Sequence, residues 1–370
     1  MALTLHGTVA NNTAVLSRPN AKPLVINGDM NIAQRATSLT GYTGGAGYTT
    51  LDRWRFDVNT LGTWTIAQTA SSPDNSGLIN SFRVDCTTAD ASPASGDFAI
   101  FSTRLEGQDF QMFKKGTSNT EKMTVSFYVK SNKTGTYIME IDDNDNARNI
   151  NQAYTISSAN TWEKKVLTFA GDTSGALGND NGDSLRLLWF LGAGSGFTSS
   201  SLQTSWAGTD NTKRAVGQVN LADSTANDWS ITGIQLEVGE FDANSIAPFQ
   251  HESYGDSLVR CQRYCQTWQA DHTNDLFCTG MSYGSTLWLV NLQMKTTMRT
   301  PPSVTFSAPN RFYVHNNVAG AIACTTIAAT NLTPNTGMVL GAVAGGLTAG
   351  NANNLLAQGA DTKITATAEL

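Results

Sequence analysis

With 370 residues, the chain is long enough for two domains of ordinary size, each with its own core. Only 15% of the residues are charged, while Gly (33 residues), Ser, Thr and Asn are abundant, which favours short strands and tight turns over long helices. A net charge of −6 argues against the basic surface that nucleic-acid binders display, so we expect no nucleic-acid partner.

The N-terminal residues 1–25 are polar and end in SRPNAKP, whose two prolines favour extended backbone. We predict an extended arm here, which either packs on a partner or is disordered. The sequence shows no basic segment followed by an apolar core at its start, and no apolar run of the ~20 residues that cross a bilayer. We therefore expect a soluble protein with no export signal and no membrane insertion.

Residues 26–250 are predicted to form a β-sandwich of the jelly-roll type. In residues 122–130 the side chains of Met123, Val125, Phe127 and Val129 fall on one face, with polar residues between them. Comparable strands, separated by Gly, Asn and Asp clusters, are predicted at 51–58, 64–69, 81–86, 98–105, 136–141, 153–156, 162–169 and 184–191.

The predicted strand at 51–58 carries two arginines. Trp54 and Phe56 share one face of this strand, and Arg53 and Arg55 share the other. The arginines fit an anion site, but arginines on the solvent face of a strand are the commoner case.

A change of phase marks the last strand of this domain. Trp229 and Ile231 alternate with polar residues, and the alternation resumes at Ile234 and Leu236 one residue out of phase, with Gly233 at the slip. This pattern predicts a β-bulge in a core strand.

A short helix is predicted over residues 251–269, because Leu258, Cys261, Cys265 and Trp268 fall on one helical face. Ser253 or Asp256 is expected to cap its start.

A second, smaller β domain is predicted at 270–370, with strands at 275–283, 285–294, 303–306 and 311–315. Its tail from residue 318 is dominated by Ala, Gly, Thr and Asn, and such small residues bury little apolar area per strand. We therefore expect this half to depend on neighbouring chains in a homo-oligomer.

The long polar stretch after Leu191 contains two isolated aromatic residues, Phe197 and Trp206. Long loops are usually functional or disordered, so these two side chains are the candidate ligand-binding residues, stacking on a ligand. Alternatively, they fold back over the edge of the sandwich as anchors.

The sequence offers no positive evidence for catalysis, a cofactor or a metal. The Asp/Asn-rich stretch from Ile141 lacks the glycine and the glutamate of an EF-hand loop, having Ala147 and Ala153 at those positions. Glu106, Glu140, Glu163 and Glu237 are available carboxylates, but none lies in a recognisable catalytic string. The five cysteines, an odd number, are expected to be buried packing residues, not disulfides or ligands: Cys86, Cys261, Cys265, Cys278 and Cys324.

A series of strings between residues 25 and 268 resembles a family of tailed-phage virion proteins, common in marine and cyanobacterial phages and described as tail fibre or structural proteins. The strings are NGDMNIAQR (27–35), YTTLDRW (48–54), LEGQD (105–109), FYVKSNKTGTY (127–137), DNDNARNI (143–150), NTWEKKVLTFAGD (160–172), RAVGQVNL (214–221), W-x-ITG-x-QLEVG (229–239) and APF-x-H-x-SYGD-x-L-x-RCQRY (247–264).

The resemblance implies a jelly-roll domain similar to carbohydrate-binding modules, carried on a virion that assembles in the host cytoplasm. It implies other virion proteins as partners. The N-terminal arm lies outside the strings and is a candidate attachment point. A host cell-surface glycan as ligand follows only by analogy with the fold, and we expect a homo-oligomer, taken here as a trimer. It transfers no catalytic residue. Three hypotheses follow: a non-enzymatic tail-fibre or adhesion protein, a purely structural head decoration, head fibre or tail adaptor, and a polysaccharide depolymerase.

Overall fold

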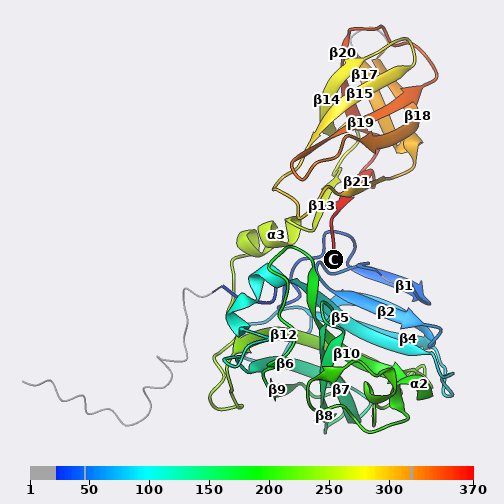
Figure 1. The fold of residues 1–370 in the computed structure, drawn as a ribbon. Helices are drawn as coiled ribbons and strands as arrows, with labels where there is room; N and C mark the ends of the chain where they lie inside the picture. The colour runs from blue at the N-terminus through cyan, green and yellow to red at the C-terminus, as the bar shows by residue number, and fades with distance from the viewer. Residues whose placement is uncertain (1–21, 46, 317–319) are drawn as a thin grey trace, which may run out of the picture. The chain divides into compact units, whose positions relative to one another are not determined.

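The computed structural model describes residues 22–45, 47–316 and 320–370, and the chain divides into two compact units (Figure 1). The first unit ends at Ser257, and the second spans Leu258–Glu369. Nearly all of the predicted N-terminal arm lies outside the described residues. None of the helices in these ranges is long and apolar enough to cross a membrane.

The N-terminal unit contains two six-stranded antiparallel sheets, which confirms the predicted β-sandwich, although the edge strands at Ser38–Tyr42 and Ala207–Gly208 were not predicted. The first sheet has the order β1 (Ser38–Tyr42), β3 (Thr63–Thr69), β4 (Ser81–Thr88), β12 (Asp228–Val238), β6 (Met123–Ser131) and β9 (Glu163–Phe169). The second sheet has the order β11 (Ala207–Gly208), β8 (Arg148–Ile156), β7 (Gly135–Asp143), β10 (Asp183–Ala193), β5 (Phe98–Glu106) and β2 (Arg55–Asn59).

Aromatic rings from the two sheets meet in one core. Phe82 of β4 stacks on Phe101 of β5 with ring centroids 4.3 Å apart, and Phe127 of β6 meets Trp189 of β10 edge to face at 5.5 Å. All four side chains are buried. Such rings bury large apolar areas and also interact through their geometry, so they hold the sheets face to face as a sandwich.

The predicted bulge is confirmed in β12. Its pairing with β6 shifts register between Thr232 and Gln235, and Gly233 has a φ of 62°, which favours glycine. The backbone N–H of Ile234 then donates to the carbonyl of Gly28 at 2.9 Å. A Cβ at Gly28 would lie 2.1 Å from the Ile234 carbonyl oxygen, so only glycine allows this approach.

Asn27, beside that glycine, ties three segments together. Its side-chain amide donates to the backbone carbonyls of Ile32 and Asp52 at 2.9 Å each. The backbone carbonyl of Asn27 accepts from the Trp54 indole at 2.8 Å. The side chain of Asn27 is 2% exposed, and buried polar groups with complete hydrogen bonding specify one backbone path.

The predicted strand at 51–58 starts later than expected. Arg53 has a φ of 71° and is buried, with its guanidinium donating to the carbonyl of Arg104, so the interpretation that it lies on the solvent face is wrong. Strand β2 begins only at Arg55, because the tie to Asn27 holds residues 51–54 in turns.

A buried ammonium group holds the loops at the end of β7. Lys115 is fully buried, and its Nζ donates to the Asp143 carboxylate and to the carbonyl of Gly175, 2.8 Å away, and lies 3.0 Å from Asp172. Asn146 completes the cluster by donating to Asp143. The Asp/Asn-rich stretch is therefore a strand-connecting turn around a lysine.

The helix α3 spans Tyr254–Gln262, which is shorter than predicted. Ser253 caps it as expected, since its hydroxyl oxygen accepts from the backbone N–H of Asp256 at 3.1 Å. The prediction of helix through residue 269 is wrong, because Cys265–Gln269 forms strand β13. This strand pairs with β21 (Lys363–Thr367), about a hundred residues further on, and a local periodicity contains no information about that partner.

The second unit contains a small sheet and a closed barrel, confirming a smaller C-terminal β fold. The sheet has the order β13, β21 and β16 (Ser303–Phe306). The barrel has the order β14 (Leu276–Ser282), β15 (Leu287–Gln293), β19 (Thr336–Val343), β18 (Gly320–Thr330), β17 (Phe312–Asn316) and β20 (Ala352–Ala357). Trp288, Val290 and Phe312 are buried inside it, and closure leaves no open sheet edge.

All five cysteines are buried as free thiols, as the sequence predicts.

We predict that Lys115→Met destabilises the protein by about 3–5 kcal/mol, because it leaves the buried carboxylate of Asp143 without its cation, while Asp172 keeps its ion pair with Arg148. Urea unfolding followed by tryptophan fluorescence measures the change. The control is Lys122→Met, which removes an exposed ion pair with Glu240 and should cost less than about 1 kcal/mol. Equal losses for the two variants would contradict a stabilising role of the cluster.

Candidate functional site

The outer face of the second sheet carries an unusual number of polar side chains. Along β5, Ala99, Phe101 and Leu105 belong to the core, so Ser102 and Arg104 in the alternate positions point outward. The same alternation places Arg186 and Leu188 of β10 on the outer face.

The loop over residues 194–220 covers part of this face. Arg214 from the loop donates to Glu140 of β7 at 2.9 Å, and Gln203 donates to Asn149 of β8 at 2.7 Å. Ala215 packs with apolar side chains of β7 and β10. The segment therefore covers part of the outer face of β7 and β8. It leaves the outer face of β2, β5 and the adjoining part of β10 accessible to solvent.

The open side is hollowed into a cavity of about 570 Å³, which we call the sheet groove. It is lined by Gly45, Arg55, Asp57, Val58, Asn59, Phe98, Ile100, Ser102, Arg104, Arg186 and Leu188. The three strands that form it are neighbours in Figure 1 although they are far apart in the sequence. Its volume falls in the range typical of small-ligand sites.

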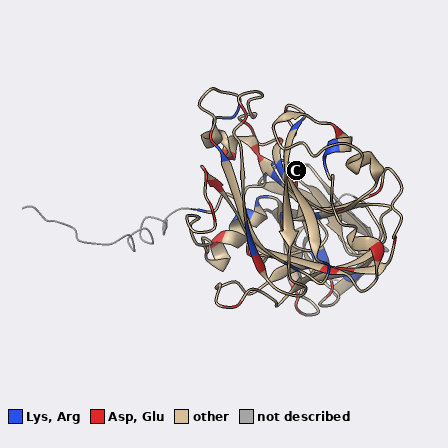
Figure 2. Ribbon diagram, turned by 90° about the horizontal axis from the view of Figure 1, so that it is seen from below, with Lys and Arg blue, Asp and Glu red and all other residues tan. Residues whose placement is uncertain are grey.

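Three arginines in the sheet groove each bond to a carboxylate. Arg55 donates to Asp57 at 2.8 Å, Arg104 lies 2.9 Å from Asp183, and Arg186 bonds to Asp183 at 2.7 Å. Figure 2 shows that Lys and Arg residues are interspersed with Asp and Glu residues over the ribbon. The side chains of Arg104 and Arg186 remain 24% and 25% exposed, so donors on both reach the solvent.

Burial and crowded charges alter the acid–base properties of these groups. Burial raises the pKa of Asp142 to about 6, with Glu140 adding to the shift and Arg214 and Arg186 opposing it. Burial also lowers the pKa of Arg104, against the pull of Asp183 and with help from neighbouring arginines. Arg104 lines the groove, and Asp142 lies behind it in contact with Arg186, so extra hydrogen bonds from a ligand to Arg104 would stabilise its charged form.

The floor of the sheet groove between these charges is apolar. It includes Phe98, Ile100 and Leu188, of which Ile100 and Leu188 are largely buried. An apolar floor edged by paired donors and acceptors suits a ligand with apolar ring faces and many hydroxyl groups.

The structure places the two predicted ligand-binding residues apart. Phe197 lies beside the sheet groove, with its ring edge-on to Phe98 at 5.6 Å. Trp206 contacts the Lys115 cluster instead: the Lys115 Nζ lies 4.7 Å from its ring centroid, and its indole donates to the carbonyl of Ala170 at 2.6 Å. Ligand binding by either residue stays a prediction.

Sequence reasoning raised Arg55 as an anion-binding candidate but missed Arg104 and Arg186. The signal for Arg186 was present, because it is the polar residue that interrupts an apolar run in β10. The pattern could not show that β2, β5 and β10 would lie side by side.

The four glutamates considered as catalytic candidates have partners in the fold. Glu140 binds Arg214, Glu163 binds Lys165, and Glu106 accepts from Gln108. Glu237 lies at a second, smaller hollow of about 220 Å³.

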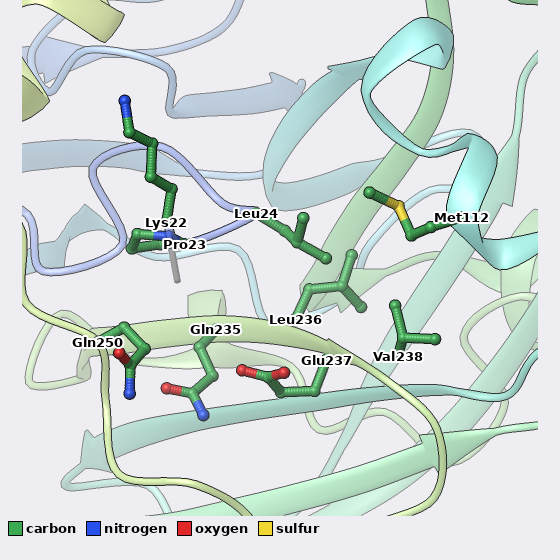
Figure 3. Close-up of a pocket in the computed structure, with 9 residues that line it drawn as sticks. All are labelled: Lys22, Pro23, Leu24, Met112, Gln235, Leu236, Glu237, Val238 and Gln250. Carbon is green, nitrogen blue, oxygen red and sulfur yellow. The ribbon is translucent and has the colours of Figure 1, made fainter. Parts of the chain in front are cut away.

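That second hollow lies where the first described residues pass β12. It is lined by Lys22, Pro23, Leu24, Met112, Gln235, Leu236, Glu237, Val238 and Gln250. Figure 3 shows Leu24, Leu236 and Met112 gathered on one side and the polar ends of Gln235, Glu237 and Gln250 on the other.

Among the described residues, no group of three or more His, Cys, Asp or Glu side chains is arranged to hold a metal ion.

No protein-family model and no curated protein matches this chain. Among solved structures, similarity is found to the enzymatically active domain of bacteriophage CBA120 tailspike protein 4, with 13% identity, 50% of this chain, 19% of that chain and a TM-score of 0.28. The matched part is thus about a fifth of that tailspike chain.

Two binding modules show similar values. The CBM22-1 xylan-binding domain of Paenibacillus barcinonensis Xyn10C has 11% identity, with 61% of this chain, all of that chain and a TM-score of 0.26. TmCBM61 in complex with β-1,4-galactotriose has 8% identity, with 59% of this chain, 99% of that chain and a TM-score of 0.29. These TM-scores are low, and we draw nothing about this chain from the three likenesses.

We predict a pH-dependent stability set by Asp142. Because its pKa is raised in the fold to about 6, the unfolded chain ionises first, and stability is lost as the pH rises through about 6. Asp142→Asn removes this loss, so relative to the wild type it should gain roughly 2–3 kcal/mol between pH 3.5 and pH 7.5. Urea unfolding across this pH range measures the difference.

The control for this series is Asp74→Asn, which changes an exposed side chain and should follow the wild-type profile. A constant difference between Asp142→Asn and the wild type at all pH values would contradict the raised pKa.

Proposed function

We propose that this protein is a non-enzymatic component of a tailed-phage virion that binds a glycan of the host cell surface through the sheet groove. The observation that carries the proposal is the groove itself, an open hollow with an apolar floor and three arginines that pair with two carboxylates.

A sugar ring suits this surface for two chemical reasons. Its apolar faces can pack on the floor at Phe98, Ile100 and Leu188. Its neighbouring hydroxyls both donate and accept hydrogen bonds, so they can bond to a guanidinium and a carboxylate of the same pair. Arg104 and Arg186 share the carboxylate of Asp183, so the groove offers a sugar three guanidinium groups and two carboxylates.

The virion part of the proposal is supported by the ordered series of strings that resembles phage virion proteins. We place the protein in the tail, as a fibre or adhesion protein that acts as a homo-oligomer. Weak sugar contacts in several copies would then sum to firm attachment. A map of the virion that locates this chain in the capsid lattice would overturn the tail assignment.

A purely structural role, as a head decoration, head fibre or tail adaptor, is the alternative. One observation favours it. The strings that resemble virion proteins include residues whose hydrogen bonds join segments of the sandwich, such as Asn27, Asp52 and Trp54. Binding of a glycan, and its loss in groove variants, separates the two roles.

We predict that Arg104→Gln and Arg186→Gln each weaken glycan binding by about 10–100-fold, because each removes charge-assisted hydrogen bonds from the sheet groove. An array of bacterial surface glycans identifies the ligand, and titration calorimetry measures the affinity. The control is Arg83→Gln on the first sheet, which also loses an ion pair but should bind like the wild type.

Absence of binding to any glycan, together with absence of adsorption to host cells, would overturn the adhesion role. Release of reducing ends from a bound glycan would overturn the non-enzymatic part and support a depolymerase.

A further inference from the structure

The outer face of the C-terminal barrel carries a row of apolar side chains across four neighbouring strands. Met281 of β14 pairs with Leu289 of β15, Leu289 pairs with Leu340 of β19, and Leu340 pairs with Ala328 of β18. Side chains directly opposite in a sheet share a face, so these four residues form one line.

The row faces away from the barrel core. Trp288 and Val290, on either side of Leu289, are fully buried, so Leu289 points outward. Met281 is 42% exposed and Leu340 37% exposed.

A second row adds to the first. Leu287 pairs with Ala342, two residues along from Leu289 and Leu340, and Leu287 is 52% exposed. Tyr283, whose backbone N–H donates to the Leu287 carbonyl, is also exposed. We call the two rows together the barrel stripe: Met281, Tyr283, Leu287, Leu289, Ala328, Leu340 and Ala342.

None of the six barrel strands contains a Lys, Arg, Asp or Glu residue. Charged side chains are the usual means by which exposed β surfaces avoid association. A contiguous apolar stripe without them indicates a surface that is covered in the working protein.

Identical copies of this chain fit the stripe best. In a cyclic oligomer the side chains nearest the symmetry axis face their own equivalents in the other copies, so any charge there would face its like at close range. The stripe carries none, although the chain as a whole has a net charge of −6. Its large side chains also lie next to small ones, Ala328 and Ala342, which leave room for the large side chains of another copy.

We propose that the barrel stripe is the surface through which copies of this chain associate into a cyclic homo-oligomer. The inference locates the contact for the oligomer in the proposed function, and it does not require that a glycan binds.

The test is the mass of the 370-residue chain in solution, measured by sedimentation velocity over a range of concentrations. The wild type should sediment as an oligomer, and Leu340→Lys should shift towards the 39.5 kDa monomer with a dissociation constant at least tenfold weaker. The matched control is Ile79→Lys, which changes a side chain 65% exposed in the N-terminal unit and should keep the wild-type mass.

A cross-linking arm separates association from misfolding. The native cysteines are buried, so in Leu340→Cys a short bis-maleimide should join two copies through the new thiol, whereas Ile79→Cys should stay monomeric on a denaturing gel. A wild type that is monomeric at every concentration, or a Leu340→Lys variant that keeps the wild-type oligomer, would overturn the proposal. Glycan binding by a monomeric Leu340→Lys variant would leave the proposed function intact.

Discussion

The N-terminal unit depends on one close contact, the approach of Gly28 to the bulge of β12. The contact requires glycine at position 28 and a left-handed residue at Gly233, and it lets the Ile234 N–H bond to the Gly28 carbonyl. The backbone carbonyl of the neighbouring Asn27 accepts a hydrogen bond from the Trp54 indole, which connects this contact to the start of β2. Arg55 follows directly, which means that the contact at the bulge also sets the edge of the sheet groove.

The strings that resemble virion proteins and the residues of the sheet groove are different parts of the chain. The strings contain the residues that fix the backbone at the bulge of β12 and before β2, namely Asn27, Gly28, Trp54 and Gly233. The lining residues of the sheet groove all fall between the strings. The resemblance therefore informs about the fold and the setting of the protein, while ligand chemistry has to be argued from the groove itself.

The two units are stabilised by different interactions, in keeping with the different roles that we propose for them. The sandwich buries stacked aromatic rings and a fully buried lysine with two carboxylates. The barrel has small residues in its strands, no strand charges and an apolar outer stripe. A rigid sandwich that presents a groove and a barrel that associates would together place several weak sites on one particle.

Local patterns in the sequence were sufficient for most of the sandwich strands, though not for β1 and β11, and for the bulge at Gly233, the cap at Ser253 and the burial of the cysteines, because each depends on residues a few positions apart. Tertiary structure decided the rest. Cys265 and Trp268 match a helical face, yet they form a strand because β21 pairs with them from the far end of the chain. The sheet groove likewise exists only because β2, β5 and β10 become neighbours, and hydrogen bonds between distant strands leave no local periodicity that could predict it.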